Sequence, residues 1–223
     1  MSGMKSTKDE ILVLLKRNGG HSVSELAGTL GLSTVTVRQH LTHLERDALV
    51  ATAVSHTNGR QHYVYRLTAK AHAAAFPRRS DRLVELLMRE IGLLDASQLE
   101  QLTPRERTSM IVRRLAHRLA DEYASLLQGW PLQERVVFVT EVMQADGGFA
   151  EWEETGQGYE IRDFNCLFHR LFGRDGEGEV CEWHSNFLSQ MLGTAVRVSP
   201  CQDSEEHCCR FVIEELSPVV AAR

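Results

Sequence analysis

The chain has 223 residues, 43% hydrophobic and 25% charged, which is ordinary for a globular protein with room for two small domains. No apolar run approaches the roughly 18 residues of a membrane span, and the first ten residues lack the apolar stretch of a secretion signal. These features argue against a membrane protein and predict a cytoplasmic one. Charge is uneven: residues 1–80 hold 11 Lys and Arg against 5 Asp and Glu, whereas residues 81–223 hold 14 against 25. The basic first third suggests a polyanion partner for that part alone.

The first 67 residues follow the order helix, helix, helix, hairpin. The first helix is predicted over 7–18 and the third over 34–46; a short helix between them starts at a capping box, Ser22 with Glu25, and ends at Gly31. Asn58-Gly59 between two β-rich runs is a strong hairpin signal. This order is typical of a winged helix-turn-helix domain.

The third helix has the pattern of a DNA-recognition helix. Val37, Leu41 and Leu44 form its buried stripe, and the opposite face carries side chains suited to base edges or phosphates. Arginine at the hairpin tip can reach the DNA backbone or the minor groove. Double-stranded operator DNA is therefore the expected partner, and the predicted contact residues are Ser33, Thr34, Thr36, Arg38, Gln39, His43 and Arg60.

The middle of the chain is predicted to be helical. A helix starts at Thr68 and breaks at Phe76-Pro77, another covers 81–91, and a long one runs over 103–127. The long helix carries a continuous apolar stripe consisting of Ile111, Leu115, Leu119, Tyr123 and Leu126. We expect this stripe to form a homodimer interface, because winged-helix proteins commonly pair to span two half-sites. The alternative is packing within one chain.

The last part of the chain mixes helices and strands. Helices are predicted over 132–145 and 180–192, a hairpin over 149–164, and strands over 195–198 and 209–213. The fold class is therefore α+β. The predicted division is a winged helix-turn-helix domain over 1–77, a helical dimerisation segment over 78–129 and a C-terminal sensor domain over 130–223.

All five cysteines lie in the last quarter of the chain, at Cys166, Cys181, Cys201, Cys208 and Cys209. In a reducing cytoplasm such a group indicates metal binding or redox activity more than structural disulfides. The paired Cys-x2–4-Cys spacing of zinc knuckles is absent, and widely spaced thiolates favour an iron–sulfur cluster, with zinc or a thiol–disulfide switch as alternatives. Because neighbours in a strand point to opposite faces, Cys209 shares the apolar face of Phe211 and Ile213 and is the better ligand of its pair.

Four features resemble one known family: the helix Val35-Thr36-Val37-Arg38-Gln39-His40-Leu41, the wing from Gly59-Arg60 to Tyr63-Val64-Tyr65-Arg66-Leu67-Thr68, Phe76-Pro77, and Asn165-Cys166-Leu167-Phe168. Together they resemble the SufR-type regulators, winged-helix repressors of iron–sulfur cluster assembly operons with a helix-turn-helix like those of DeoR and ArsR proteins. The resemblance implies a homodimeric repressor in which a cluster, [4Fe–4S] in type, sets operator affinity.

The same resemblance implies that Cys166, Cys181 and Cys209 hold the cluster. The spacing between Cys166 and Cys181 is longer than the usual family form, with the extra residues expected in the loop over 173–179. The fourth ligand stays open between Cys208 and Cys201, or a non-cysteine group among His169, His184 and Glu182.

Two functions from other classes are also compatible with these residues. One is a small-molecule- or redox-responsive winged-helix regulator with a structural zinc ion or a thiol switch. The other is a metal-binding enzyme or carrier fused to a DNA-binding domain. The sequence contains no Walker loop, dinucleotide-binding glycine motif or nucleophile elbow, so we expect no catalytic residues.

Overall fold

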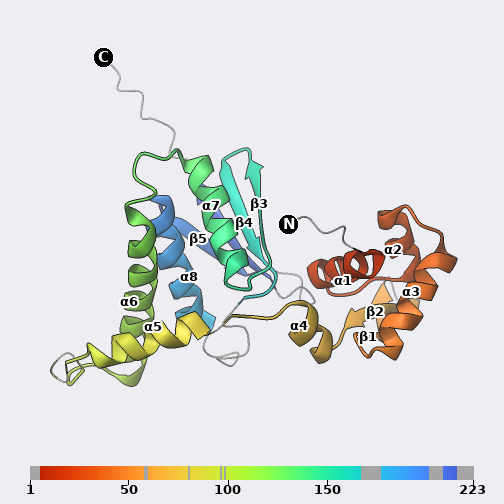
Figure 1. The fold of residues 1–223 in the computed structure, drawn as a ribbon, viewed down its shortest axis with the longest axis horizontal. Helices are drawn as coiled ribbons and strands as arrows, with labels where there is room; N and C mark the ends of the chain where they lie inside the picture. The colour runs from red at the N-terminus through yellow and green to blue at the C-terminus, as the bar shows by residue number, and fades with distance from the viewer. Residues whose placement is uncertain are drawn as a thin grey trace, which may run out of the picture. The chain divides into compact units, whose positions relative to one another are not determined.

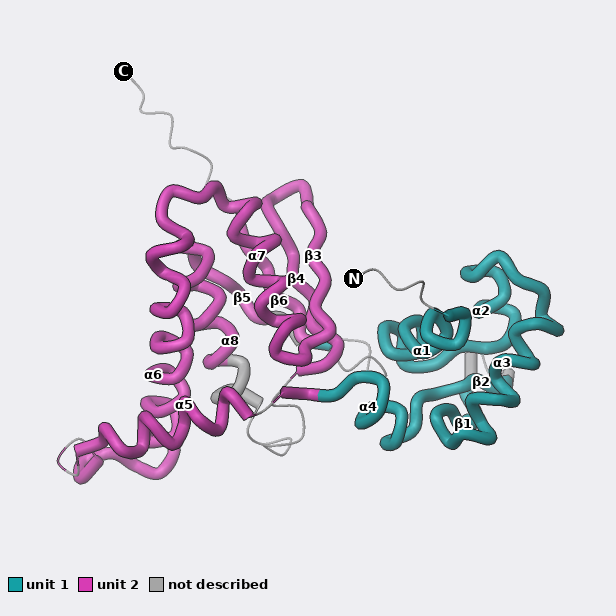
Figure 2. Tube along the Cα trace, viewed as in Figure 1, with its two compact units in different colours: residues 1–77, 201–208 teal, residues 78–200, 209–223 magenta. Residues whose placement is uncertain are grey.

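The structure is a computed structural model that describes residues 6–57, 60–79, 81–95, 97, 99–166, 177–200 and 208–214. For residues 56, 57, 60, 177–181, 199 and 200 it describes the backbone alone. Two compact units divide the chain (Figure 2). The first comprises residues 1–77 with 201–208, and the second comprises residues 78–200 with 209–223.

The first unit contains the three predicted helices and the hairpin, followed by one short helix (Figure 1). Its elements are α1 (Thr7–Asn18), α2 (Val23–Leu30), α3 (Thr34–Arg46), β1 (Val50–Thr57), β2 (Arg60–Leu67) and α4 (Ala69–Ala75). Ser22 and Glu25 form the expected capping box at α2, and Gly31 ends that helix with a left-handed backbone, φ 66° and ψ 28°. Such a conformation favours glycine and makes the tight turn into α3.

The core of this unit lies between the three helices and the first strand of the hairpin. Val37, Leu41 and Leu44 of α3 are buried, as their spacing predicts, against residues of α1, α2 and β1. Backbone hydrogen bonds in both directions between His21 and Tyr65 add the α1–α2 loop to the hairpin as a third short strand. Each element therefore buries one face, which holds α3 with its opposite face exposed.

The described residues of the second unit form four helices and an antiparallel sheet (Figure 1). Its elements are α5 (Asp81–Gly92), α6 (Pro104–Ala124), α7 (Leu132–Ala145), β3 (Ala150–Thr155), β4 (Gly158–Asp163), α8 (Glu177–Leu192), β5 (Val196–Pro200) and β6 (Cys209–Glu214). The strands are ordered β3-β4-β6-β5, with every neighbouring pair antiparallel. This arrangement confirms the α+β class.

One face of the sheet carries the core. Alternate residues of the central strands, among them Ile161 of β4 and Phe211 of β6, are completely buried. Charged residues from the same strands lie on the other face and pair there, with Glu160 contacting both Arg162 and Arg210 at 3.2 Å. The sheet thus presents a single apolar layer, against which α7 and α8 pack.

Within α6 the apolar stripe is buried or half-buried, and Leu126, just after the helix, is 49% exposed. Leu115 and Leu119 are only 5% and 3% exposed and belong to the same core as α8, which packs along α6. The expectation that this stripe forms the dimer interface is therefore wrong, and intramolecular packing explains it. Residues 78–129 also share one core with the residues that follow, so the expected separation at residue 129 is not seen.

Among the described residues, the longest helix, α6, is too charged to lie in a bilayer, and none of the others is long and apolar enough to span one.

Candidate metal centre and DNA-binding face

Among the described residues, three side chains of types that can ligate a metal meet inside the second unit. Asp163 is the last residue of β4, Cys166 follows three residues later, and His184 projects from α8. Their ligand atoms all lie within 4.8 Å of one another, and all three residues are buried. A carboxylate, a thiolate and an imidazole make a donor set suited to zinc or iron. Burial also keeps competing water away from the donors.

The local structure fixes Asp163 and the segment leading to Cys166. The Oδ1 atom of Asp163 accepts hydrogen bonds from the backbone N–H groups of Phe149, at 3.1 Å, and Asn165, at 2.9 Å. The Asn165 side chain in turn donates to the carbonyl of Gly147 at 2.7 Å. A Cβ on Gly148 would lie 2.6 Å from the Met143 carbonyl oxygen, so this loop can only approach so closely with glycine. The turn after β4 is therefore pinned on two sides.

His184 lies in an apolar pocket that keeps it neutral. Its ring packs edge-on against Trp183, with centroids 4.8 Å apart, and against Phe211 at 5.3 Å. Burial lowers the pKa of His184 to about 4, and the nearby Asp163 carboxylate offsets this only in part. A neutral imidazole keeps the nitrogen lone pair that a metal ligand needs.

Cys209 is a ladder neighbour of Asp163 but is not one of the three residues whose ligand atoms all lie within 4.8 Å of one another. It pairs with Asp163 across the β4–β6 ladder, on the side of β6 that carries the buried Phe211 and Ile213, as its alternation predicts. Cys208 is disulfide-bonded, and a disulfide sulfur is not a thiolate ligand. The Glu182 side chain is engaged away from the group, accepting from Ser109 at 2.7 Å.

The remaining predicted ligands lie outside the described part of the structure. The backbone of α8 passes through position 181, but the Cys181 side chain lies outside the described residues. The same is true of Cys201 and His169. Asp163, in contrast, belongs to the group, although no sequence pattern singled it out.

A hydrogen bond links this centre to the start of the second unit. The Nε atom of Arg78 donates to the carbonyl oxygen of Cys166 at 2.9 Å. The backbone N–H of Arg79 donates to the carbonyl of Asp146, at the end of α7, at 3.1 Å. Arg78 directly follows Pro77, the last residue of the N-terminal stretch of the first unit. The segment that enters the second unit is thus held against the loop carrying Cys166.

The free face of α3 carries the residues predicted to contact DNA. The side chains of Thr34, Arg38, Gln39 and His43 are exposed. Ser33 and Thr36 hold the start of the helix, because the Ser33 hydroxyl accepts from the Thr36 N–H at 3.1 Å and hydrogen-bonds its hydroxyl at 2.9 Å. Arg60 begins β2, opposite Thr57, but its side chain lies outside the described residues.

Comparison with known families supports this geometry for the first unit. Residues 5–49 match a family described as winged helix-turn-helix DNA-binding. The N-terminal unit is a winged helix-turn-helix DNA-binding domain. No curated protein matches the chain.

Solved structures of bacterial regulators give only a distant likeness. A ZitR mutant of Lactococcus lactis in apo form is 21% identical over 52% of this chain and 81% of its own, with a TM-score of 0.29. The zinc-dependent MarR family regulator AdcR, in its Zn(II)-bound state, is 24% identical over 55% of this chain and 76% of its own, with a TM-score of 0.28. Such scores do not indicate a shared overall arrangement.

The winged domain has an exposed aromatic residue that sequence patterns did not single out. Tyr63 of β2 is 64% exposed and pairs with Val54 of β1, which is 47% exposed. Val35, in the first turn of α3, is also 64% exposed. Exposed apolar side chains on DNA-binding elements can contact thymine methyl groups or sugars. The available signal for Tyr63 was its alternation with Val64, which is buried.

Proposed function

We propose that this protein is a transcription regulator whose affinity for operator DNA is set by a metal centre in its second unit. The observation that carries this proposal is the buried group of Asp163, Cys166 and His184, together with the Arg78 hydrogen bond to Cys166. That bond joins the metal-binding loop to the segment immediately after the DNA-binding domain. A change at the centre therefore has a covalent and hydrogen-bonded route to the part of the chain that leads to DNA.

An iron–sulfur cluster on Cys166, Cys181 and Cys209 is the form of cofactor that we propose first. Its support is the buried thiol of Cys166, the place of Cys209 opposite Asp163, and the course of α8 through position 181. When bound, such a cluster would cross-link the end of β4, α8 and β6 through thiolates. Cluster-assembly genes as the target, and repression as the direction of control, are proposed on the family resemblance alone.

A single metal ion is a second candidate, favoured by the spacing of the donors. Zinc bound by thiolate, imidazole and carboxylate has bonds of roughly 2.0–2.3 Å, so tetrahedral donors are roughly 3.3–3.8 Å apart. Donors already within 4.8 Å of one another need little movement to reach one ion. Ligands of different irons in a cluster must stand farther apart, so a cluster requires this group to open.

Operator recognition is proposed to need two copies of the chain, because winged-helix domains commonly read two half-sites. The α3 residues Thr34, Arg38, Gln39 and His43 would enter the major groove of each half-site. Arg60 would contact the backbone or minor groove beside it.

Purification without oxygen tests the cofactor. Iron, sulfide and zinc are measured in the wild-type protein and in a Cys166→Ser variant, alongside the absorption spectrum. A cluster predicts iron and sulfide in equal amounts with broad absorption near roughly 400 nm, both lost in the variant. A colourless protein with one zinc per chain supports the single-ion candidate. A wild-type protein that binds neither, even after reconstitution with each, contradicts a metal centre.

A further inference from the structure

We propose that His184 is a direct ligand of the metal centre and supplies its non-cysteine donor. This inference rests on the proposed metal centre but not on which metal is bound. The geometric basis is that the imidazole nitrogen, the Cys166 sulfur and an Asp163 oxygen all lie within 4.8 Å of one another in the interior. Asp163 and Cys166 lie in one turn after β4, whereas His184 comes from α8, so the tertiary fold brings the histidine to the other two donors.

The position of His184 on its helix is the second support. Helix α8 covers both position 181 and position 184, and residues three apart lie on the same face of a helix. Metal sites inside helical proteins use this i, i+3 spacing for a carboxylate and a histidine.

The surroundings of His184 favour it over the other candidates. The ring is 4% exposed and wedged between Trp183 and Phe211, so its orientation toward Cys166 is fixed by packing. Cys208 is disulfide-bonded and precedes β6, which begins at Cys209. Glu182 accepts from Ser109 and lies 3.7 Å from Arg113, so it serves the contact with α6 instead.

Asp163 holds the partner ligand in place. Its Oδ1 atom fixes the backbone at Phe149 and Asn165, and Cys166 follows directly in the same turn. The thiol therefore faces His184 before any metal arrives. Preorganised donors of this kind bind a single metal ion without a large rearrangement.

X-ray absorption at the edge of the bound metal tests this proposal directly on the wild-type protein, purified without oxygen. An imidazole ligand gives a characteristic outer-shell scattering pattern, and we expect that pattern from one histidine per centre. A metal-loaded protein with sulfur scattering alone overturns the proposal for His184 while leaving the metal centre in place. A protein that binds no iron, sulfide or zinc overturns the proposed function as well, so the two failures differ.

Variants give a second, independent readout. His184→Phe keeps an aromatic ring between Trp183 and Phe211 but removes the nitrogen, whereas His184→Cys restores a soft donor. We expect His184→Phe to lose metal to a chelator about 10-fold faster or more, and His184→Cys to retain it with an altered spectrum. His117→Phe, on the exposed surface of α6, is the matched control. Wild-type retention and spectrum in His184→Phe would overturn the proposal.

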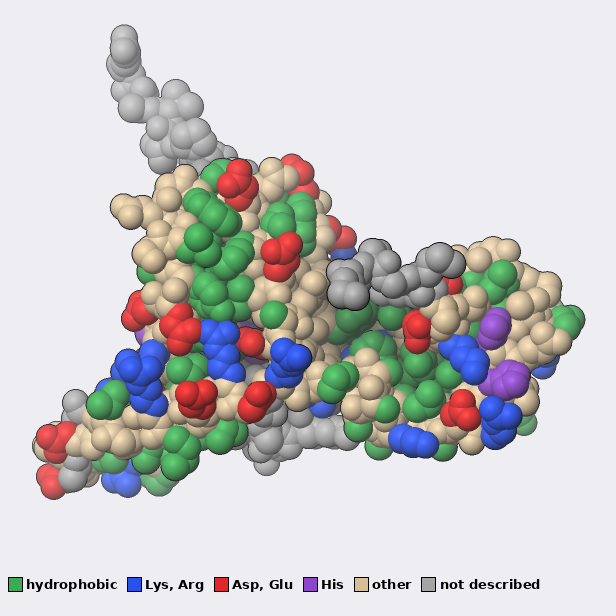
Figure 3. All heavy atoms as spheres, viewed as in Figure 1, with side chains coloured by type: hydrophobic (Ala, Val, Ile, Leu, Met, Phe, Trp, Pro, Cys, Tyr) green, Lys and Arg blue, Asp and Glu red, His purple; other side chains and the backbone are tan. Residues whose placement is uncertain are grey.

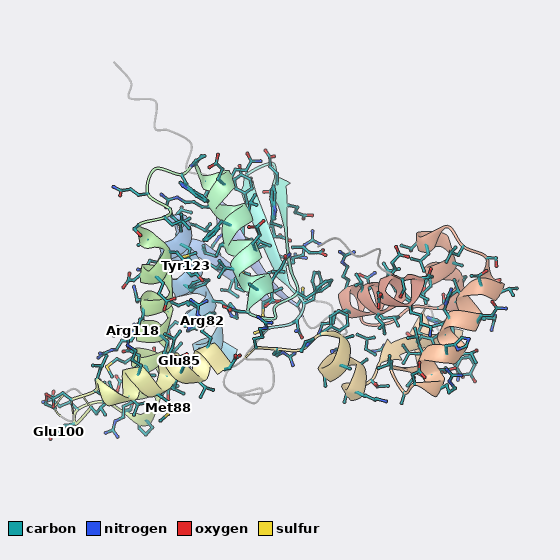
Figure 4. The ribbon with its side chains drawn as sticks, viewed as in Figure 1. Arg82, Glu85, Met88, Glu100, Arg118 and Tyr123 are labelled. Atoms are coloured by element: carbon teal, nitrogen blue, oxygen red, sulfur yellow. The ribbon has the colours of Figure 1, made fainter. Side chains whose placement is uncertain are left out.

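A separate observation concerns the surface of α5, from which we infer a self-association face. Val84, Met88 and Ile91 are 53%, 64% and 49% exposed and follow one another at i, i+4 and i+7. In Figure 4, Met88 lies on the edge of α5 away from Arg118 and Tyr123 of α6. Figure 3 shows hydrophobic side chains gathered along this part of the second unit. Leu86 and Glu90 are buried instead, so the exposed apolar stripe and the buried side of α5 are different faces of the helix.

The charges beside this stripe match a second copy of the same helix. Glu85 and Arg89 are both exposed and lie one turn apart. A two-fold axis near position 87 would pair two α5 helices antiparallel. Glu85 would then lie opposite Arg89 of the partner subunit, and the same contact would form again on the other side of the axis. The DNA-binding domain provides the reason for pairing, since two half-sites need two domains. Leu115 and Leu119 of α6 cannot serve, because both are buried within the chain.

Sedimentation of the full-length protein tests this face. We expect a wild-type dimer and a monomer for Met88→Glu, whereas Leu126→Glu, at an exposed leucine after α6, should remain dimeric. Reversing Glu85→Arg or Arg89→Glu alone should weaken the dimer about 2-fold or more, and the double reversal should restore it. Circular dichroism of each variant confirms that it folds. A monomeric wild type, or a Met88→Glu variant as dimeric as wild type, overturns the assignment.

Discussion

Replacing Arg78 with alanine tests the route from the metal centre to the DNA-binding domain. Its guanidinium Nε donates to the Cys166 carbonyl at 2.9 Å in a half-buried setting. Hydrogen bonds from charged donors contribute about 1.5–3 kcal/mol, and partial exposure places this one near the lower limit, about 1.5 kcal/mol. If the bond forms only when the centre is filled, its loss lowers the metal-dependent gain in operator affinity by up to about 10-fold.

The assay compares affinities of metal-loaded and chelator-treated protein for a duplex obtained by selection from random DNA, using fluorescence anisotropy. Arg79→Ala is the control, because its hydrogen bond to Asp146 uses the backbone N–H and its side chain is exposed. The loaded-to-stripped ratio should fall in Arg78→Ala and stay near the wild-type value in Arg79→Ala. A ratio unchanged in Arg78→Ala, at full metal content, would refute this route.

Four further predictions concern stability and DNA contact. Burial raises the pKa of Glu90, but hydrogen bonds from Arg118 and Arg114 outweigh it and hold the pKa below 4.5. The stabilisation from Glu90 should therefore be complete above pH 4.5 and fade as pH falls below it, which acid unfolding followed by circular dichroism can detect. Glu90→Gln should lower the free energy of unfolding by about 3 kcal/mol, which is the low end for a broken buried ion pair. The low end applies because the side chains of Arg114 and Arg118 are 32% and 34% exposed. Urea titration measures this free energy. Arg60→Ala should reduce the salt dependence of DNA binding by about one unit if the contact is to phosphate, and an unchanged slope and affinity would exclude that contact. Gln39→Ala should weaken binding to the selected duplex by about 1–3 kcal/mol and relax the base preference at one base pair. Repeating the selection with the variant measures that base preference.

The winged domain could be predicted because its signals are local. Caps, glycine turns and a three-residue apolar stripe specify α3 within 13 residues, and the structure buries Val37, Leu41 and Leu44 as expected. Strand alternation likewise placed Cys209 on the side of Phe211. Such features depend on residues close together in the sequence, so they can be recognised without knowledge of the tertiary fold.

The partner of an apolar stripe is harder to predict, because periodicity shows that a face is buried but not against what. Leu115 and Leu119 meet α8, about 70 residues later, which made an internal contact look like a dimer interface. Asp163 was missed for a similar reason: it reaches Cys166 and His184 only through the β4 turn and the packing of α8. The spacing of Cys181 and His184 on one helix was the signal that could have singled out the histidine.

The central claim is that the metal centre controls DNA binding, and one measurement tests it most directly. Protein purified without oxygen is divided, one half is stripped of metal with a chelator, and both halves are titrated against the same selected duplex at one salt concentration. The account predicts that stripping weakens binding about 5- to 150-fold, the range of a typical coupling between two sites, and that restoring metal recovers it. Equal affinities for the loaded and stripped halves, with folding intact, would contradict it.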